Sequence, residues 1–411
     1  MQVPEGWETL TTEQILQNKK GAIKIGPFGS ALKKEFFVPE GYRVFGQENV
    51  FNNDFTIGER RVDEERFQKL KSCTLEANDI VISMMGTIGK CVLVPEDIEV
   101  GIMDSHLLRL QINHVVCDAT YIMQLIANYE LIQQQIKRLS VGGIMAGLSS
   151  TVIKQLTFPI PPLPEQKKIA EILSTCDECI ENTEKQIAKL KDLKKATMQE
   201  LLTKGIGHTE FKDSPLGRIP KSWEVVKLEG VTTYSQGIQV DLSLQINEPK
   251  EGYLKFLRIE NYTQLSQDFR FVPQDLGRNK FINNDDVVVV RYGATAGYVG
   301  RGFEGILANN LFKVSPNEEL LTKGFIYYII LNLYECFQNL MSGGAMPALS
   351  FGMLNEIKIS LPPLPEQVKI TETISSIDSN IESKEQKLSK LKDQKKALMN
   401  DLLTGKVRVW K

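Results

Sequence analysis

Several loops of this sequence combine cationic, amide, hydroxyl and aromatic side chains, the types that bind nucleic acids. One loop surrounds Gly-Pro-Phe-Gly at 26–29, and another follows four consecutive valines at 287–290. Arginine, asparagine, glutamine and hydroxyl groups read base edges, whereas lysine and loop N–H groups hold phosphates. The candidate contact residues are Lys24, Phe28, Ser30, Lys33, Lys34, Gln47, Asn49, Thr87, Lys90, His106, Gln236, Gln239, Arg258, Asn261, Arg291, Tyr292, Thr295, Tyr298, Asn309 and Asn310. Taken singly, each also fits an ordinary polar loop, and that alternative stays open.

The sequence contains no convincing catalytic or metal-binding motif. The segment 86–90 faintly resembles a phosphate-binding loop, but it lacks the required spacing and the hydroxyl residue after lysine. Cys176 and Cys179 have the spacing of half a zinc site or of a redox pair. A second copy of this stretch has Ile377 and Asn380 at these positions, so we interpret both cysteines as core residues. We therefore expect a non-catalytic chain that binds no cofactor or metal itself.

Composition predicts a soluble protein without a strong charge. The 411 residues carry 49 basic and 51 acidic side chains, with 42% hydrophobic and 24% charged residues. This balance is not the footprint of a protein that binds DNA tightly alone, so partners should supply part of the phosphate contact. No apolar run approaches the roughly 18 residues of a membrane span. Six cysteines without framework spacing fit a reducing cytoplasm.

One stretch of the chain occurs twice. The block at 161–203 returns without a gap at 362–404, with 25 identities in 43 aligned positions. The segments that precede the two blocks share landmarks, such as Trp7 and Trp223, but little identity. The sequence therefore predicts an internal duplication with modules at 1–160 and 207–360 and repeated segments at 161–206 and 361–411.

The repeated segments are predicted to be long helices that form a coiled coil. Pro164 and Pro365 suit a helix start, and no glycine or proline follows Pro164 until Gly205. Apolar residues recur in steps of four and three. The seam positions are Ile169, Leu173, Ile180, Ile187, Leu190, Leu201, Ile370, Ile374, Ile377, Ile381, Leu388, Leu391, Leu398 and Leu402. Since a whole module separates the copies, we expect an antiparallel pair about a pseudo-twofold axis, with a parallel pair as the less simple alternative.

The modules themselves read as mixtures of strands and helices. Residues 80–83 and 90–94 have the pattern of strands. Apolar residues at helical spacing predict one amphipathic helix over 121–139, and 322–340 takes its place in the second module.

The repeated blocks resemble the conserved regions of the specificity subunit of type I restriction–modification enzymes. The resemblance rests on the run Leu-Pro-Glu-Gln at 163–166 and 364–367 and on the run Leu-Leu-Thr at 201–203 and 402–404. The opening Ile-Pro-x-x-Trp at 219–223 resembles the family's entry into a second recognition domain. The match covers essentially the whole chain.

This resemblance implies an α+β fold, in which two strand-rich α/β target-recognition domains are separated by an antiparallel coiled coil. Each domain would read one half of a bipartite, asymmetric DNA site, and the coiled coil would set the spacer. Two adenine methyltransferase subunits would dock on it, with S-adenosylmethionine as methyl donor, and motor-nuclease subunits would use ATP and Mg²⁺. The alternative is a non-DNA scaffold that presents two ligand-binding modules.

Overall fold

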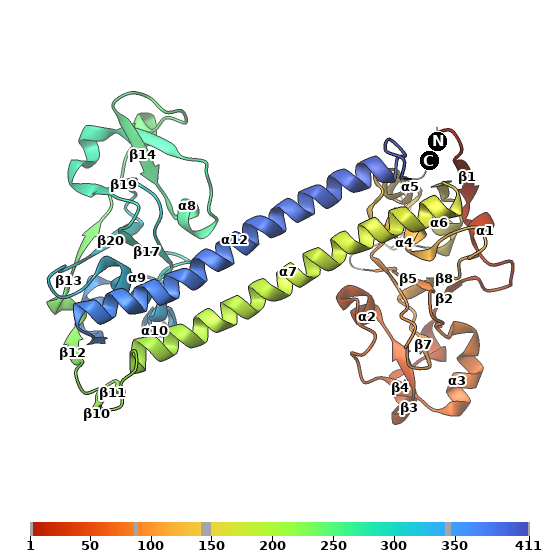
Figure 1. The fold of residues 1–411 in the computed structure, drawn as a ribbon, viewed down its shortest axis with the longest axis horizontal. Helices are drawn as coiled ribbons and strands as arrows, with labels where there is room; N and C mark the ends of the chain where they lie inside the picture. Colours follow the sequence, from red (N-terminus) through yellow and green to blue (C-terminus); the bar gives the residue numbers. More distant parts are fainter. Residues whose placement is uncertain (1–2, 86–88, 141–148, 342–346, 410–411) are drawn as a thin grey trace. The chain divides into compact units, whose positions relative to one another are not determined.

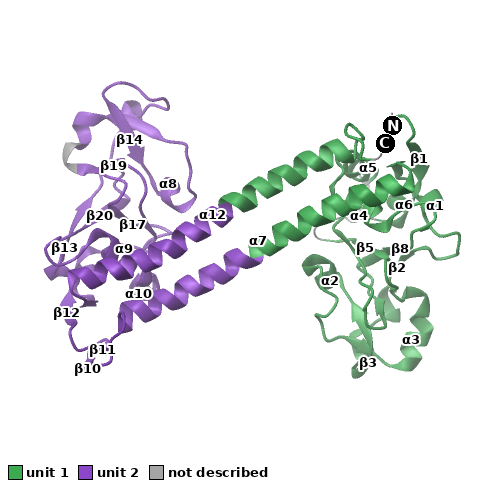
Figure 2. Ribbon diagram, in the orientation of Figure 1, with its two compact units in different colours: residues 1–184, 386–411 green, residues 185–385 purple. Residues whose placement is uncertain are grey.

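The computed structural model describes residues 3–85, 89–140, 149–341 and 347–409. Thr87 and its neighbours at 86 and 88, which belong to the loop compared with a phosphate-binding loop, lie outside this part. The chain folds as two compact units (Figure 2): unit 1 contains residues 1–184 and 386–411, and unit 2 contains residues 185–385. In the described part, no helix has the length and apolar character needed to cross a membrane.

Two long helices, α7 (Leu163–Lys204) and α12 (Leu364–Leu402), each contribute one half to both units (Figures 1 and 2). Within unit 1, Lys392 pairs with Glu184 at 2.7 Å. Within unit 2, the repeat-equivalent residues Lys191 and Glu385 pair at the same distance. Residues early in one half-helix thus meet residues late in the other. The expected antiparallel coiled coil is confirmed in each unit.

The charge pattern along the helices favours this orientation. Acidic residues concentrate in the first half of each helix and lysines in the second half. A second set of equivalent contacts joins Lys395 to Asp177 in unit 1 and Lys194 to Asp378, at 2.6 Å, in unit 2. A parallel pair would place acid beside acid. Exposed ion pairs add only about 0–1 kcal/mol each, so they select the orientation more than they stabilise it.

The structure places the seam positions at the buried or half-buried side of the helices. The buried ones are Ile169, Leu173, Ile187, Ile370, Ile374, Ile381 and Leu402. The half-buried ones are Ile180, Leu190, Leu201, Ile377, Leu388, Leu391 and Leu398. Cys176 is half-buried, but Cys179 is exposed, so its interpretation as a core residue was wrong. Cys179 falls one position before the seam residue Ile180, outside the four–three pattern.

The module of unit 1 contains two sheets and a strand pair, flanked by short helices (Figure 1). The first sheet has the order β2 (Ile23–Ile25), β8 (Leu107–Leu110), β5 (Ile80–Ser83), β6 (Cys91–Leu93), and all its pairs are antiparallel. The second has the order β4 (Arg61–Val62), β3 (Phe37–Phe45), β7 (Gly101–Met103), and β1 (Glu8–Thr11) pairs with β9 (Thr157–Ile160). The helices are α1 (Thr12–Ile15), α2 (Gln47–Asn52), α3 (Glu64–Leu70), α4 (Ala119–Asn128), α5 (Glu130–Ser140) and α6 (Ser150–Lys154).

The module of unit 2 repeats this plan. Its first sheet has the order β13 (Thr232–Gln236), β20 (Leu311–Pro316), β17 (Val287–Val290), β18 (Val299–Gly300). Its second has the order β15 (Arg270–Pro273), β14 (Tyr253–Leu257), β19 (Gly305–Leu307), β16 (Phe281–Ile282). Two strand pairs are β12 (Glu224–Lys227) with β21 (Lys358–Leu361) and β10 (Phe211–Ser214) with β11 (Gly217–Pro220). The helices are α8 (Ile259–Thr263), α9 (Lys323–Asn332), α10 (Tyr334–Met341) and α11 (Phe351–Asn355).

The single helix predicted over 121–139 is two helices in the structure, and 322–340 is also divided into two. Tyr129 has φ −79° and ψ 115°, which is extended backbone, and it separates α4 from α5. Leu333 separates α9 from α10. Because the apolar spacing continues across Tyr129 into the buried Ile132 and Ile136, periodicity alone did not reveal the break.

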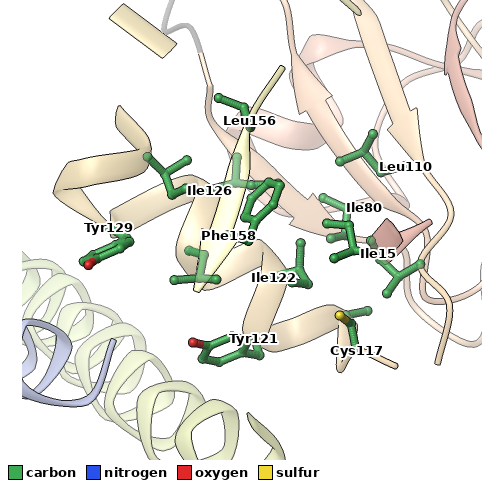
Figure 3. Close-up of a cluster of buried hydrophobic side chains, with 14 of the residues drawn as sticks. Ile15, Ile80, Leu110, Cys117, Tyr121, Ile122, Ile126, Tyr129, Leu156 and Phe158 are labelled. Atoms are coloured by element: carbon green, nitrogen blue, oxygen red, sulfur yellow. The ribbon is translucent and has the colours of Figure 1, made fainter. Parts of the chain in front are cut away.

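The core of unit 1 joins the module to the long helices. Figure 3 shows Tyr121, Ile122 and Ile126 of α4 around Phe158 of β9. Ile169 and Leu173 of α7 belong to the same buried cluster. Burying such a side chain contributes about 1.5–3 kcal/mol, so the helices are built into the module core rather than appended to it.

One buried glutamine near the start of each long helix fixes that helix to its module. Gln367 accepts a hydrogen bond from the Thr322 N–H at 2.9 Å and donates to the Leu320 carbonyl at 2.8 Å. Gln166 makes the equivalent bonds to the Asp118 N–H at 2.8 Å and the Val116 carbonyl at 3.1 Å. These equivalent hydrogen bonds attach the segment before α4 to the start of α7, and the segment before α9 to the start of α12, in the same way.

The ends of the helices pack against equivalent tryptophans. Gly205 has φ +67°, and a Cβ there would lie 2.7 Å from the Trp223 ring, so only glycine fits. The Trp223 indole N–H donates to Glu366 at 2.9 Å. In unit 1, Gly405 (φ +69°) approaches Trp7, and Glu165, the equivalent of Glu366, accepts two bonds from Arg408. Gly405 and Arg408, near the end of the described chain, therefore pack against the first module and the start of α7.

Candidate nucleic-acid interface

In unit 2, three strand ends bring predicted contact residues to one sheet edge. Gln236 is the last residue of β13, Arg291 follows β17, and Asn309 with Asn310 directly precedes β20. The register pairs Gln236 with Phe312 and Val290 with Leu311. Since β13 and β17 both run antiparallel to β20, their carboxyl ends meet its amino end.

The side chains at this edge form a continuous network. The Arg291 guanidinium donates to the Gln236 side-chain oxygen, and the Gln236 amide donates to the Asn309 carbonyl at 2.9 Å. The Asn309 amide donates to the Gln239 side-chain oxygen at 3.4 Å, and the Arg291 N–H to the Asn310 carbonyl at 2.8 Å. Five predicted residues are therefore brought together. Amide and guanidinium groups of this kind can hydrogen-bond the edges of bases.

The groups that contact the Arg291 guanidinium in the described part of the chain are neutral. Its guanidinium carbon lies 5.0 Å from the centre of the Tyr292 ring and 4.6 Å from that of Phe351. Its Nε is buried without a hydrogen-bond partner, and no described carboxylate lies within ion-pair distance. Arg258, by contrast, pairs with Glu260 at 2.8 Å. An arginine held by aromatic faces and an amide keeps donors available for a base or a phosphate.

Phe351 is a site residue that sequence reasoning missed. It begins α11 and stacks on Tyr234, with ring centres 5.3 Å apart. The two repeated blocks begin 201 residues apart, at 161 and 362, and the same offset relates Phe351 to Ser150, the first residue of α6. The presence of an aromatic residue in one module where the other has a small one could have indicated from the sequence that Phe351 belongs to the site.

Unit 1 has an equivalent edge at the ends of β2, β5 and β8. The Gly26 N–H donates to the Leu107 carbonyl at 3.1 Å, and the Met84 N–H donates to the His106 carbonyl at 2.9 Å. A Cβ at Gly26 would lie 1.8 Å from the Asp104 carbonyl oxygen. At Gly237, the equivalent residue in unit 2, it would lie 2.1 Å from a backbone oxygen. In both modules, the residue that follows the first strand of this sheet therefore lies so close to a backbone oxygen that only glycine fits there.

The chemistry of the unit 1 edge differs from that of unit 2. Phe28 is 64% exposed on its loop. The Gln47 amide donates to the Ser83 hydroxyl at 2.6 Å and to the Met85 carbonyl at 2.7 Å, and the His106 side chain is exposed. The edge of unit 2 thus carries an arginine between two aromatic rings, whereas the edge of unit 1 carries an exposed phenylalanine, an exposed histidine and a glutamine whose amide is bonded within the module.

The remaining predicted residues are not drawn into either network. Lys90 donates to the Phe51 carbonyl at 2.7 Å, and Lys33 lies 3.4 Å from Glu35. Ser30 and Lys34 are exposed, Lys24 and Thr295 are half-buried, and Tyr298 packs beside the apolar cluster of the second sheet.

Asn49 and Asn261, two of the predicted contact residues, hold turns of the modules together, and their burial does not favour the predicted DNA contact. Both are buried. The Asn261 side-chain oxygen accepts the Arg258 N–H at 2.8 Å, and its amide donates to the Ser266 carbonyl at 2.9 Å. Asn49 forms the same pattern with the Gly46 N–H at 2.8 Å and a carbonyl at 2.9 Å. Arg258 is also committed to its own turn, where it donates to the Asp268 carbonyl at 3.0 Å.

Replacing Asn261 with alanine is expected to destabilise unit 2 by about 1–3 kcal/mol, because buried backbone groups lose their partners. Chemical denaturation of the purified chain measures this change. Asn310→Ala is the control, since an exposed side chain should alter stability by less than about 0.5 kcal/mol. If Asn261→Ala kept full stability, the structural assignment of this residue would be wrong.

Equivalent aspartates anchor the turns that lead into β5 and β17. Asp79 accepts the Glu76 N–H at 2.8 Å, and Asp286 accepts the Asn283 N–H at 2.9 Å. Burial raises the pKa of Asp79 to about 6, although Arg109 lies 3.8 Å away. Burial acts on Asp286 in the same direction but is outweighed, chiefly by the hydrogen bond from Lys313, so its pKa is lowered. The strands that carry the two edges thus start from matching turns.

No cluster of described residues has the side chains needed to hold a metal ion.

A family model for the type I restriction modification DNA specificity domain matches residues 4–192 and 220–393. The type I restriction enzyme MjaVIII specificity subunit of Methanocaldococcus jannaschii is 28% identical over 428 aligned residues, which span 100% of this chain and 95% of the relative. The putative MjaX specificity subunit of the same organism is 29% identical over 99% of this chain and 95% of its own.

The fold is also found in a solved structure. The type I restriction–modification S subunit from M. genitalium matches with a TM-score of 0.64 at 18% sequence identity, over 98% of both chains. The duplicated architecture described above is therefore that of a known fold.

Proposed function

Since the chain belongs to the type I restriction modification DNA specificity family, we propose that each of its two modules reads one half of a bipartite, asymmetric DNA site. The chain's role in DNA sequence specificity follows from the family. The assignment of one half-site to each module rests on the two sheet edges, which share their backbone geometry and differ in their side chains.

The two sheet edges share their backbone geometry but carry different side chains, and this observation supports the proposal. Gly26 and Gly237 make the same close backbone approach, and Met84 and Arg291 occupy the same hydrogen-bonded position. Side chains at such an edge can change without disturbing the sheet. Two equivalent edges with different chemistry are what an asymmetric site with two different half-sites requires.

The chain would act as the non-catalytic member of a larger complex. Two adenine methyltransferase subunits would bind S-adenosylmethionine and modify one adenine in each half-site. Motor-nuclease subunits would join for cleavage and use ATP and Mg²⁺. Partners would also supply phosphate contacts, because the net charge of this chain is −2.

Binding by the reconstituted complex of this chain with its methyltransferase tests the proposal. We expect binding that weakens steeply with salt and that prefers one bipartite sequence over shuffled DNA by at least about a thousandfold. Binding that depends on salt but not on sequence would contradict a role of the modules in reading bases.

Adding one heptad to both long helices, after Ile187 in α7 and after the equivalent Leu388 in α12, is expected to lengthen the spacer. Seven residues keep the seam in phase and add about 10 Å, or about three base pairs. Methylation mapping measures the gap between the two modified adenines. A longer α7 alone should disturb the pairing with α12 and serves as the control. An unchanged gap in the variant with both insertions would contradict the proposal that the length of the long helices sets the spacer.

A further inference from the structure

Among the described residues, the most exposed large apolar side chains are those of Val115, Leu242, Leu265 and Phe28, which are 64–85% exposed. Single exposed apolar residues are ordinary on protein surfaces. Because the two modules share one plan, an exposed apolar side chain is more informative where both modules have one at the same place. Each of the four residues can therefore be compared with its counterpart in the other module.

Val115 and Leu265 have polar counterparts. The Val115 N–H donates to the side chain of the asparagine two residues before it at 3.1 Å, and the Glu319 N–H forms the same bond at 3.2 Å. Leu265 has φ +52° and its counterpart Asn53 has φ +50°, each four residues after the buried asparagine of its turn. Neither of these two apolar side chains is repeated.

Phe28 and Leu242, by contrast, lie in equivalent loops. Each loop follows the first strand of the edge sheet and starts with the glycine that closely approaches a backbone oxygen. Each contains a short 3-10 turn, η1 (Gly29–Ala31) in unit 1 and η5 (Leu242–Leu244) in unit 2. Phe28 directly precedes its turn, and Leu242 begins its own. The same loop thus exposes a large apolar side chain in both modules, although the two loops differ in sequence.

The loop that carries Leu242 is fixed on both sides of this residue. Before it, the Asn309 N–H donates to the Ile238 carbonyl at 2.8 Å, and Val240 is buried. After it, the Gln245 amide donates to the Val240 carbonyl at 2.9 Å. Since Asn309 belongs to the hydrogen-bonded network of the unit 2 edge, this loop is attached directly to that network.

The loop that carries Phe28 is also fixed on both sides. Before it, Gly26 is hydrogen-bonded to β8 as described above. After it, the Ala31 N–H donates to the Phe28 carbonyl at 3.2 Å, and Ala31 and Leu32 pack against a buried cluster that includes Phe45 of β3. Because both loops are held in place, little conformational entropy should be lost when Phe28 or Leu242 binds a ligand.

The major groove of DNA contains one apolar group that such a side chain can contact. Every base pair presents hydrogen-bond donors or acceptors there, and thymine adds its C5-methyl group. The amide and guanidinium groups of the sheet edges suit the donors and acceptors, whereas recognition of a methyl group requires an apolar surface. A phosphate is not a suitable ligand for Phe28 or Leu242, because an apolar side chain offers it neither charge nor a hydrogen bond.

We propose that Phe28 and Leu242 each pack against the C5-methyl group of a thymine, one in the half-site of each module. This inference rests on the proposed function and names one base group that each module recognises. It requires each half-site to contain at least one thymine whose methyl group contributes to binding.

Replacement of single thymines with uracil tests the contact from the side of the DNA, because uracil lacks only the methyl group. The protein is the complex of the full chain with its methyltransferase, and the probe is a duplex with the bipartite site mapped from its methylated adenines. For the wild-type complex, uracil at one position in each half-site should weaken binding about three- to fivefold, the effect of one buried methyl group.

Variants of the two side chains assign each thymine to its module. Phe28→Ala should weaken binding to the thymine duplex and make binding insensitive to uracil in one half-site, while the other half-site keeps its uracil effect. Leu242→Ala should do the same for the other half-site. Such coupling between a protein and a DNA substitution identifies a direct contact. Val115→Ala and Leu265→Asn are the matched controls, and both uracil effects should persist in them.

Three results would overturn the proposal. The first is a wild-type complex that binds thymine and uracil duplexes equally, a measurement that does not depend on the folding of any variant. The second is a uracil effect that persists in both alanine variants. The third is loss of the methyltransferase from the Phe28→Ala or Leu242→Ala complex, measured by its mass, because the side chain would then contact a protein partner.

The same binding measurements distinguish this inference from the proposed function. Sequence-selective binding without any uracil effect would remove the thymine contacts and leave the proposed function of the modules intact. Binding without sequence preference would contradict the proposed function, and the thymine contacts with it.

Discussion

Replacing Ile374 with aspartate is expected to destabilise unit 2 by more than the about 2–5 kcal/mol that truncation of a buried isoleucine to alanine costs. Ile374 of α12 is 0% exposed and belongs to the cluster that joins the long helices to the second module. A carboxylate there would be buried without a partner, in addition to the lost apolar contacts. The module would then lose its fixed attachment to the helix.

Denaturant unfolding followed by the fluorescence of the buried Trp223, which lies in the same cluster, measures this loss. Val368→Asp is the matched control, because Val368 lies on the same helix and is 44% exposed, so its change should stay within about 0.5 kcal/mol. The half-buried seam positions Leu190 and Leu391 should give intermediate losses on substitution with aspartate. Equal stability of the Ile374 and Val368 variants would show that the helix–module core does not hold unit 2 together.

Replacing Arg291 with alanine is expected to relax discrimination at one base pair of one half-site. A guanidinium that reads a base with two hydrogen bonds contributes about 1–3 kcal/mol of discrimination, or about ten- to a hundredfold. The side chain is placed for this by Gln236 and by the rings of Tyr292 and Phe351. Competition binding with single-base variants of the site measures the change.

Two further variants separate the possible roles of Arg291. Arg291→Lys keeps the charge but not the planar pair of donors, so it should behave like alanine if the residue reads a base. Arg301→Ala is the control, since this arginine is occupied by the ring of Tyr327 at 4.0 Å. A uniform loss of affinity for all sequences in Arg291→Ala, restored by lysine, would instead identify a phosphate contact.

The long helices could be predicted from the sequence because their information is local and repeated. The four–three spacing of apolar residues, the absence of glycine and proline, and the duplication all indicate the same elements. The antiparallel direction could also have been read from charge, since Glu184 and Lys191 find their partners in the other copy at Lys392 and Glu385. The break at Tyr129 could not, because the apolar pattern continues through it.

The interface was only partly predictable, because residue type does not reveal whether a side chain is free. Asn49 and Asn261 have the chemistry of base-reading residues, yet their amides are consumed by buried turns. Arg291 and Arg258 are the same residue type, but one faces aromatic rings and the other a carboxylate. The side of each strand end that meets its neighbours depends on sheet register, which no local pattern of these short strands specifies.

Sequencing of methylated adenines in a host that expresses this chain with its methyltransferase tests the central claim most directly. We predict one bipartite, asymmetric site with a modified adenine in each half and a fixed spacer between them. We also predict that Arg291→Ala broadens the recognised sequence in one half only, while the other half is unchanged. A single continuous motif, or a broadening of both halves by this one substitution, would contradict the account of two modules that each read their own half-site.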